Sequence, residues 1–100
     1  MEAVCEHLSG SKGVKSVKLR GNRLGDDGVE LLCDALRGLK VCNIDLSDNH
    51  VSEDGAYFLL DLCVGNKFVK SVKLKGNRIE RKSAKVLEKE FKRSRVIAEF

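Results

Sequence analysis

The chain lacks several residue types and patterns on which common protein classes depend. It has no proline and no tryptophan among its 100 residues, which sets aside proline-rich linkers and tryptophan-based repeat families. No apolar run approaches the ~20 residues that a membrane-spanning helix needs, so we expect no membrane segment. Residues 1–7 are acidic and do not form the apolar stretch of a signal peptide. These absences favour a globular domain.

Metal-binding and catalytic motifs are also missing. The four cysteines, Cys5, Cys33, Cys42 and Cys63, form no Cys-x-x-Cys pair and have no histidines at zinc-finger spacing. We therefore expect no metal and no cofactor, and we interpret all four as reduced thiols that pack as small apolar side chains. Together with the absence of any Asn-x-Ser/Thr site, this predicts a cytoplasmic or other intracellular, reducing location.

Nothing in the sequence assembles a catalytic site. We find no histidine–carboxylate pair and no nucleophile elbow. The glycines that precede Asn22 and Asn77 have the spacing of turn residues, so we do not interpret them as a phosphate-binding loop. The sequence therefore predicts that the protein is not an enzyme.

The chain repeats itself. Residues 14–24 return almost unchanged as residues 69–79, and residues 41–51 between them keep the same apolar skeleton. Each copy reads apolar-x-x-apolar-x-apolar-x-x-Asn-x-apolar, and its asparagine is Asn22, Asn49 or Asn77. Three copies in phase predict a repeat architecture.

The second half of each copy changes to a helical period. Apolar or small residues recur at every fourth position, which predicts an amphipathic helix that returns antiparallel to a short strand. Asp27 and Glu30 have the spacing of a capping box, and Ser52 is predicted to cap the second helix. The third helix is predicted over residues 80–95 and is far more charged than the others.

These units resemble leucine-rich repeats of the long, ribonuclease-inhibitor-like type, whose pattern is L-x-x-L-x-L-x-x-N-x-L-x-x-x-G-x-x-x-L-x-x-x-L over about 28 residues. The resemblance implies an α/β solenoid of about three repeats, with parallel strands on its concave side and helices on its convex side. It also implies a ladder in which Asn22, Asn49 and Asn77 bond to backbone groups in their own turn and in the adjacent repeat. We divide the single domain 1–100 into a partial unit at 1–13, full units at 14–40, 41–68 and 69–96, and the start of a further unit at 97–100.

The residues between the apolar positions of each predicted strand are the candidate binding residues. Strand side chains alternate, so these residues face the concave side, and parallel pairing lines up equivalent positions in rows. One such row, Lys18, Asp45 and Lys73, is expected to form an ion triplet across the strands. The full set of candidates is Lys18, Arg20, Arg23, Asp45, Ser47, His50, Lys73, Lys75 and Arg78.

This basic face predicts a non-catalytic interaction module, a scaffold that binds an acidic surface of another protein. An alternative is a nucleic-acid-binding module that uses the basic helix at 81–95, although the interleaved aromatic side chains that favour such binding are missing. Ribonuclease-inhibitor-like repeats also occur in Ran GTPase-activating proteins and NOD-like receptors. The resemblance therefore allows a fragment of a larger GTPase-regulating or ligand-sensing protein.

The repeat phase begins and ends within a unit. Residues 3–9 match the second half of a repeat helix, and Ile97 matches the start of a strand. An uncapped solenoid end exposes core-type apolar residues and an open strand edge. We therefore expect self-association through pairing or stacking of the solenoid ends.

Overall fold

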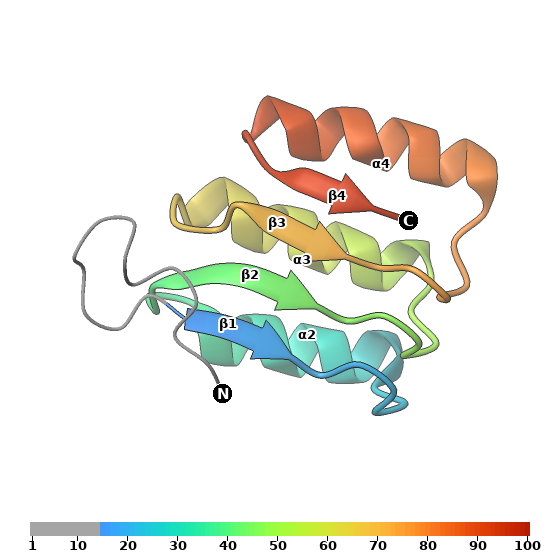
Figure 1. Ribbon diagram of the computed structural model, residues 1–100, viewed down its shortest axis with the longest axis horizontal. Helices are drawn as coiled ribbons and strands as arrows, with labels where there is room; N and C mark the ends of the chain where they lie inside the picture. The colour runs from blue at the N-terminus through green and yellow to red at the C-terminus, as the bar shows by residue number, and fades with distance from the viewer. Residues whose placement is uncertain (1–14) are drawn as a thin grey trace.

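The computed structural model describes residues 15–100, in which strands and helices alternate along the chain. The strands form one parallel sheet in the order β1-β2-β3-β4, and the helices cover one of its faces (Figure 1). The strands are β1 (Lys15–Lys18), β2 (Val41–Asp45), β3 (Ser71–Lys73) and β4 (Ile97–Glu99). The helices are α2 (Gly25–Leu36), α3 (Glu53–Gly65) and α4 (Arg81–Arg93). The predicted α/β solenoid of about three repeats is confirmed.

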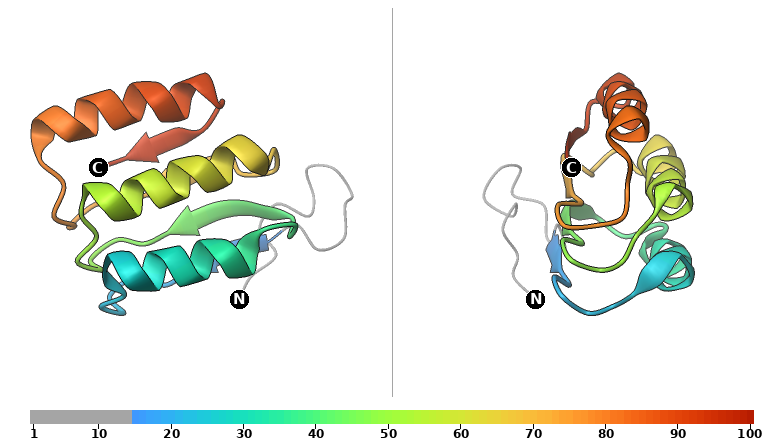
Figure 2. Two further views of the ribbon diagram at one scale, coloured as in Figure 1. Left: turned by 180° about the vertical axis from the view of Figure 1, so that it is seen from behind. Right: turned by 90° about the vertical axis from the view of Figure 1, so that its right-hand side faces the viewer.

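The fold has a layer of strands and a layer of helices because each repeat has an alternating pattern in its first half and a helical period in its second half. The left view of Figure 2 shows the helices side by side in front of the sheet, so that the strands form the opposite layer. Across the sheet, Val17 lies opposite Ile44, Ile44 opposite Val72 and Val72 opposite Ala98. These four side chains are exposed by 6% or less, so this row is the sheet's contribution to the core.

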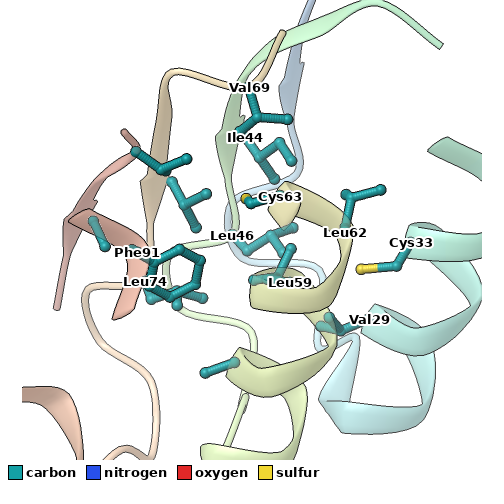
Figure 3. Close-up of a cluster of buried hydrophobic side chains, with 14 of the residues drawn as sticks. Val29, Cys33, Ile44, Leu46, Leu59, Leu62, Cys63, Val69, Leu74 and Phe91 are labelled. Atoms are coloured by element: carbon teal, nitrogen blue, oxygen red, sulfur yellow. The ribbon is translucent and has the colours of Figure 1, made fainter. Parts of the chain in front are cut away.

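The core fills the space between the two layers (Figure 3). Leu46 and Leu74 follow their strands, Leu59 and Phe91 come from α3 and α4, and all four are exposed by 2% or less. Burying a side chain of this size contributes roughly 1.5–3 kcal/mol each. Because every repeat contributes to one continuous core, the units depend on their neighbours for stability.

The helix boundaries differ from the sequence-based prediction in two places. α4 begins at Arg81 and ends at Arg93, so it is shorter than the predicted 80–95 helix. α2 begins at Gly25, which places Asp27 inside the helix, and the predicted capping box is therefore wrong. Gly25 has a φ of 66° and donates its N–H to the carbonyl of Asn49 at 2.8 Å, so a contact with the next unit sets where this helix begins.

The cysteines fall into two groups. Cys33 and Cys63 are free thiols on α2 and α3, and burial raises the pKa of each to about 12. Cys42 is disulfide-bonded, so the prediction of four reduced thiols is wrong at this residue, and the intracellular location loses part of its support. Cys5 lies outside the described residues.

Within residues 15–100, no helix combines the length and the apolar character that crossing a membrane requires. The same residues contain no group of three or more potential metal ligands. The predicted partial unit at 1–13 lies outside the described residues, and the boundaries at 14–40, 41–68 and 69–96 stay a prediction.

Candidate protein-binding face

The sheet surface turned away from the helices, here called the strand face, presents a row of charges that alternate in sign. Lys18 lies opposite Asp45, Asp45 opposite Lys73, and Lys73 opposite Glu99. The exposed lysines of this row alternate along their strands with buried Val17 and Val72, so they point away from the core. The row contains the three residues expected to form an ion triplet and continues into the fourth strand.

Two ion pairs join neighbouring repeats on the strand face. Arg20 Nε lies 3.2 Å from Asp48 Oδ2, and Lys75 Nζ lies 3.7 Å from Glu99 Oε1. All four side chains keep at least 42% of their surface exposed, so each pair contributes at most about 1 kcal/mol to stability. Arg20 and Lys75 are candidate binding residues, and a carboxylate of the same molecule partly neutralises the charge of each.

Ser47 differs from the other candidates because it is only 7% exposed. Its hydroxyl donates to Asp45 Oδ1 at 2.8 Å, and its backbone N–H donates to the same oxygen at 3.1 Å. Ser47 thus orients the Asp45 carboxylate and offers little surface of its own.

A second polar row forms the floor of a shallow hollow of about 280 Å³ at the centre of the strand face. Asn43 Nδ2 donates to Ser16 Oγ at 3.4 Å, and Ser71 Oγ donates to Asn43 Oδ1 at 2.5 Å. Lys18, Asp45 and Lys73 also line this hollow. Because the floor residues bond to one another, the charged residues above them are the groups best placed to contact a partner.

The remaining candidates lie where the strands turn toward the helices. Arg23 and His50 are exposed and have φ values of 51° and 59°, in the left-handed region, and Arg78 is also exposed. Two arginines, Arg23 and Arg78, therefore border the strand face along this edge. Counting every strand-face residue named above, six lysines and arginines stand against three acids, Asp45, Asp48 and Glu99.

The repeat asparagines bond across the turns. Asn49 Oδ1 accepts from the N–H groups of Asn22 at 2.9 Å and Leu24 at 3.2 Å, and Asn49 Nδ2 donates to the carbonyls of Leu19 and Ser47. An amide suits this position because it offers two donors and an acceptor to backbone groups that the ending strand leaves unpaired.

Asn77 makes the same set of bonds one unit later. Its Oδ1 accepts from the N–H groups of Asn49 and Val51, both at 2.9 Å, and its Nδ2 donates to the carbonyls of Leu46 at 2.9 Å and Leu74 at 3.0 Å. Each of these two asparagines therefore ties its own turn to the turn of the preceding unit.

Sequence reasoning missed a second set of contacts between repeats, in which an acid of one unit caps the helix of the next. Asp26 Oδ1 accepts from the backbone N–H groups of Ser52 at 2.8 Å and Gly55 at 3.1 Å at the start of α3. Ser52 was predicted to cap this helix, but its side chain makes no such bond and its hydroxyl instead donates to Asp26. The inter-repeat carboxylate thus takes the place of the usual local cap.

The same arrangement recurs one unit later. Glu53 Oε2 accepts from the N–H of Glu80 at 3.0 Å, just before α4. This bond is the main reason that the pKa of Glu53 lies below its ordinary value, and the nearby Ser83 side chain lowers that pKa further. The signal was present in the sequence, since Asp26 and Glu53 each follow a repeat asparagine by four positions.

Comparison with known proteins supports the same repeat family for these units. A family model described as Leucine Rich repeat matches residues 11–33. These units are leucine-rich repeats. The chain is 36% identical over 62 residues to Protein NLRC5 of Homo sapiens and 38% identical over 60 residues to Protein NLRC5 of Mus musculus. The two alignments cover 61% and 59% of this chain, and the chain spans about 3% of the length of these curated relatives.

Leucine-rich repeats are in general non-catalytic domains that mediate protein interactions, so the protein is a repeat module of that interaction class. The ribonuclease-inhibitor-like subtype of these leucine-rich repeats stays a prediction.

Proposed function

We propose that this leucine-rich-repeat module binds another protein through its strand face and catalyses no reaction. The observation that carries the proposal is the row of charges that crosses all four strands, Lys18, Asp45, Lys73 and Glu99. The first three of these residues also line a polar hollow. A surface of fixed, alternating charges on a rigid sheet favours a partner whose charges match it in position.

The partner that fits best presents an acidic surface. The strand face carries six cations and three acids, and Asp48 and Glu99 are already paired with Arg20 and Lys75. Arg78, Arg23 and Lys73 are exposed, and arginine is one of the side chains that most often dominate binding energy at interfaces. A net positive field also increases the rate of encounter with an acidic partner.

Nucleic acid fits this face less well. The row of alternating signs places Asp45 and Glu99 among the lysines, where they would repel a phosphate backbone. None of the strand-face side chains named above is phenylalanine, tyrosine or tryptophan, whereas single-stranded nucleic acids are usually held by stacking on such aromatic rings. The GTPase-regulating and ligand-sensing alternatives rest on the resemblance alone.

We keep an intracellular location as part of the proposal, because Cys33 and Cys63 are buried free thiols.

A charge-matched pair of variants tests the proposal. Lys73→Gln with Arg78→Gln removes two charges from the strand face, and Lys82→Gln with Lys89→Gln removes two from α4. Proteins retained from a cell extract by the immobilised wild type would be identified by mass spectrometry, and the purified candidate titrated against all three chains. We expect at least about a tenfold loss of affinity for the strand-face variant only, while exposed substitutions leave folding within ~0.5 kcal/mol. Equal affinities for the wild type and the strand-face variant would contradict the proposal.

A further inference from the structure

The helix layer is divided by charge. α2 contains four acidic residues and α3 three, and neither contains a lysine or an arginine. α4 contains six lysines and arginines and only two glutamates. Because the helices lie side by side in one layer, this surface is acidic over two repeats and basic over the third (Figure 2).

The division is sharpest on the outer side of the helices, at positions five, eight and twelve after each repeat asparagine. Residues spaced i, i+3 and i+7 share one helix face, and every residue at these positions is exposed. The three residues are all acidic on α2 and all basic on α4. They are Asp27, Glu30 and Asp34 on α2 and Lys82, Lys85 and Lys89 on α4.

α3, between them, presents Asp54, Tyr57 and Asp61 at the same positions, and Tyr57 is 50% exposed. Arg37 Nη2 lies 3.0 Å from Asp61 Oδ2, and Arg37 Nε lies 3.4 Å from Asp34 Oδ1. Arg37 therefore offsets part of the acidic charge near the middle of the layer, where an exposed tyrosine offers apolar area and a hydroxyl.

We propose that two copies of this chain pack helix layer against helix layer, with α2 of each copy facing α4 of the other. A two-fold axis along α3 exchanges α2 and α4 and brings equivalent positions together, so that Asp27 meets Lys82 and Glu30 meets Lys85. The two sets of charges match because both extend over seven residues, about 10.5 Å of helix. The partner is a second copy because the complementary surface lies in the chain itself.

The size of the surface is adequate for such a dimer. Helices of 12 or 13 residues extend about 20 Å, and three of them packed ~10 Å apart cover roughly 600 Å², close to the ~800 Å² that each partner gives to a standard interface. Since the outer side is largely charged, we expect a salt-sensitive association that increased ionic strength weakens by about tenfold or more.

The experiment is sedimentation of the wild type from about 5 to 200 μM, at ~50 mM and ~500 mM salt, after nuclease treatment. Two charge reversals accompany it, Asp27→Lys with Glu30→Lys and Lys82→Glu with Lys85→Glu, each checked by circular dichroism. Each reversed chain alone brings like charges together and should be monomeric. An equimolar mixture should form a heterodimer. The reversed, basic positions on α2 of one chain then face the reversed, acidic positions on α4 of the other, and the second α2–α4 contact keeps its original opposite charges.

Three results would overturn the proposal. The first is a wild type that stays monomeric at ~200 μM in ~50 mM salt. The second is a mixture of the reversed chains that fails to associate although both chains are folded. The third is a dimer that is insensitive to the helix charges and is lost in Ile97→Asp, since Ile97 lies on β4 at one end of the sheet and is 70% exposed. That last result would move the contact from the helix layer to the β4 end of the sheet.

Discussion

Replacing Asn49 with alanine should remove more stability than any exposed substitution in this protein. Asn49 is fully buried, and its amide makes four hydrogen bonds to backbone groups, two as acceptor and two as donor. Alanine leaves those four groups without a partner at a position that the core and the turn keep from water. At a net value of about 1 kcal/mol for each bond, the free energy of unfolding should fall by about 4 kcal/mol.

The assay is thermal and urea unfolding followed by circular dichroism. Since a domain of this size has about 5–15 kcal/mol of stability, the loss is a large fraction of the total. At roughly 4–8 °C for each kcal/mol, the Tm of Asn49→Ala should fall by about 15 °C or more. The dependence of the unfolding free energy on urea concentration should stay unchanged if the variant keeps its fold.

Two matched variants make this prediction refutable. Asn77 makes an equivalent set of bonds, so Asn77→Ala should cost nearly as much as Asn49→Ala. Within residues 15–100, the Asn22 side chain only donates, to the carbonyls of Leu19 and Arg20, so Asn22→Ala should cost about 1 kcal/mol. Equal losses at Asn22 and Asn49, or a loss below about 1 kcal/mol at Asn49, would refute the role assigned to these bonds.

Three further predictions concern other parts of the fold. Gly76→Ala should destabilise by about 1–3 kcal/mol, because Gly76 has a φ of 75°, which alanine adopts only with strain, and because the exposed Asp48 carboxylate, whose Oδ1 lies 1.9 Å from the position of a Cβ there, would have to turn away; a melting temperature equal to that of the wild type would contradict this. Asp26→Ala should lower the unfolding free energy by about 1–2 kcal/mol, since the start of α3 loses its cap, and Asp26→Asn should recover part of that loss. Unfolded thiols ionise near pH 9.0, whereas the folded Cys33 and Cys63 keep their protons up to about pH 12. Unfolding between pH 9 and pH 12 therefore releases protons, so the free energy of unfolding should fall as the pH rises above 9. The free energy of unfolding should decrease by up to about 2.7 kcal/mol for each pH unit in this range. This decrease should disappear when both Cys33 and Cys63 are replaced by valine.

The repeat could be predicted from the sequence because three copies in phase fix several features at once. A spacing of 27 or 28 residues between equivalent positions sets the strand register, and Asn43 does lie opposite both Ser16 and Ser71. The alternation of apolar and polar residues then assigns Val17 and Ile44 to the core and Lys18 to the opposite face.

Contacts that cross from one repeat to the next were harder to predict. The capping rules treat each helix alone, so they favoured Ser52, whereas the acid that accepts from the α3 N–H groups is Asp26, twenty-six positions earlier. The rows predicted from the sequence cross three strands, so they do not include the ion pair between Lys75 and Glu99, which depends on the fourth strand. Such contacts depend on how closely the repeats stack, which the period of the sequence does not specify.

The alternation of strand side chains also did not predict which strand-face residues are buried. Alternation placed Ser47 among the exposed residues, but its hydroxyl turns to Asp45 and the residue is nearly buried. Cys42 was interpreted as a reduced thiol because no cysteine motif surrounds it, and a disulfide depends on distances that a linear motif does not report.

Site-specific photo-crosslinking tests the central claim, that the strand face binds the partner, most directly. A crosslinking amino acid would replace Lys73 on the strand face in one chain and Arg93 at the end of α4 in another, both exposed positions. After irradiation in the same cell extract, we expect the chain labelled at position 73 to capture a partner of acidic surface in high yield. The chain labelled at position 93 should capture little of it. Capture from position 93 but not from position 73 would contradict the assignment of the strand face as the binding surface.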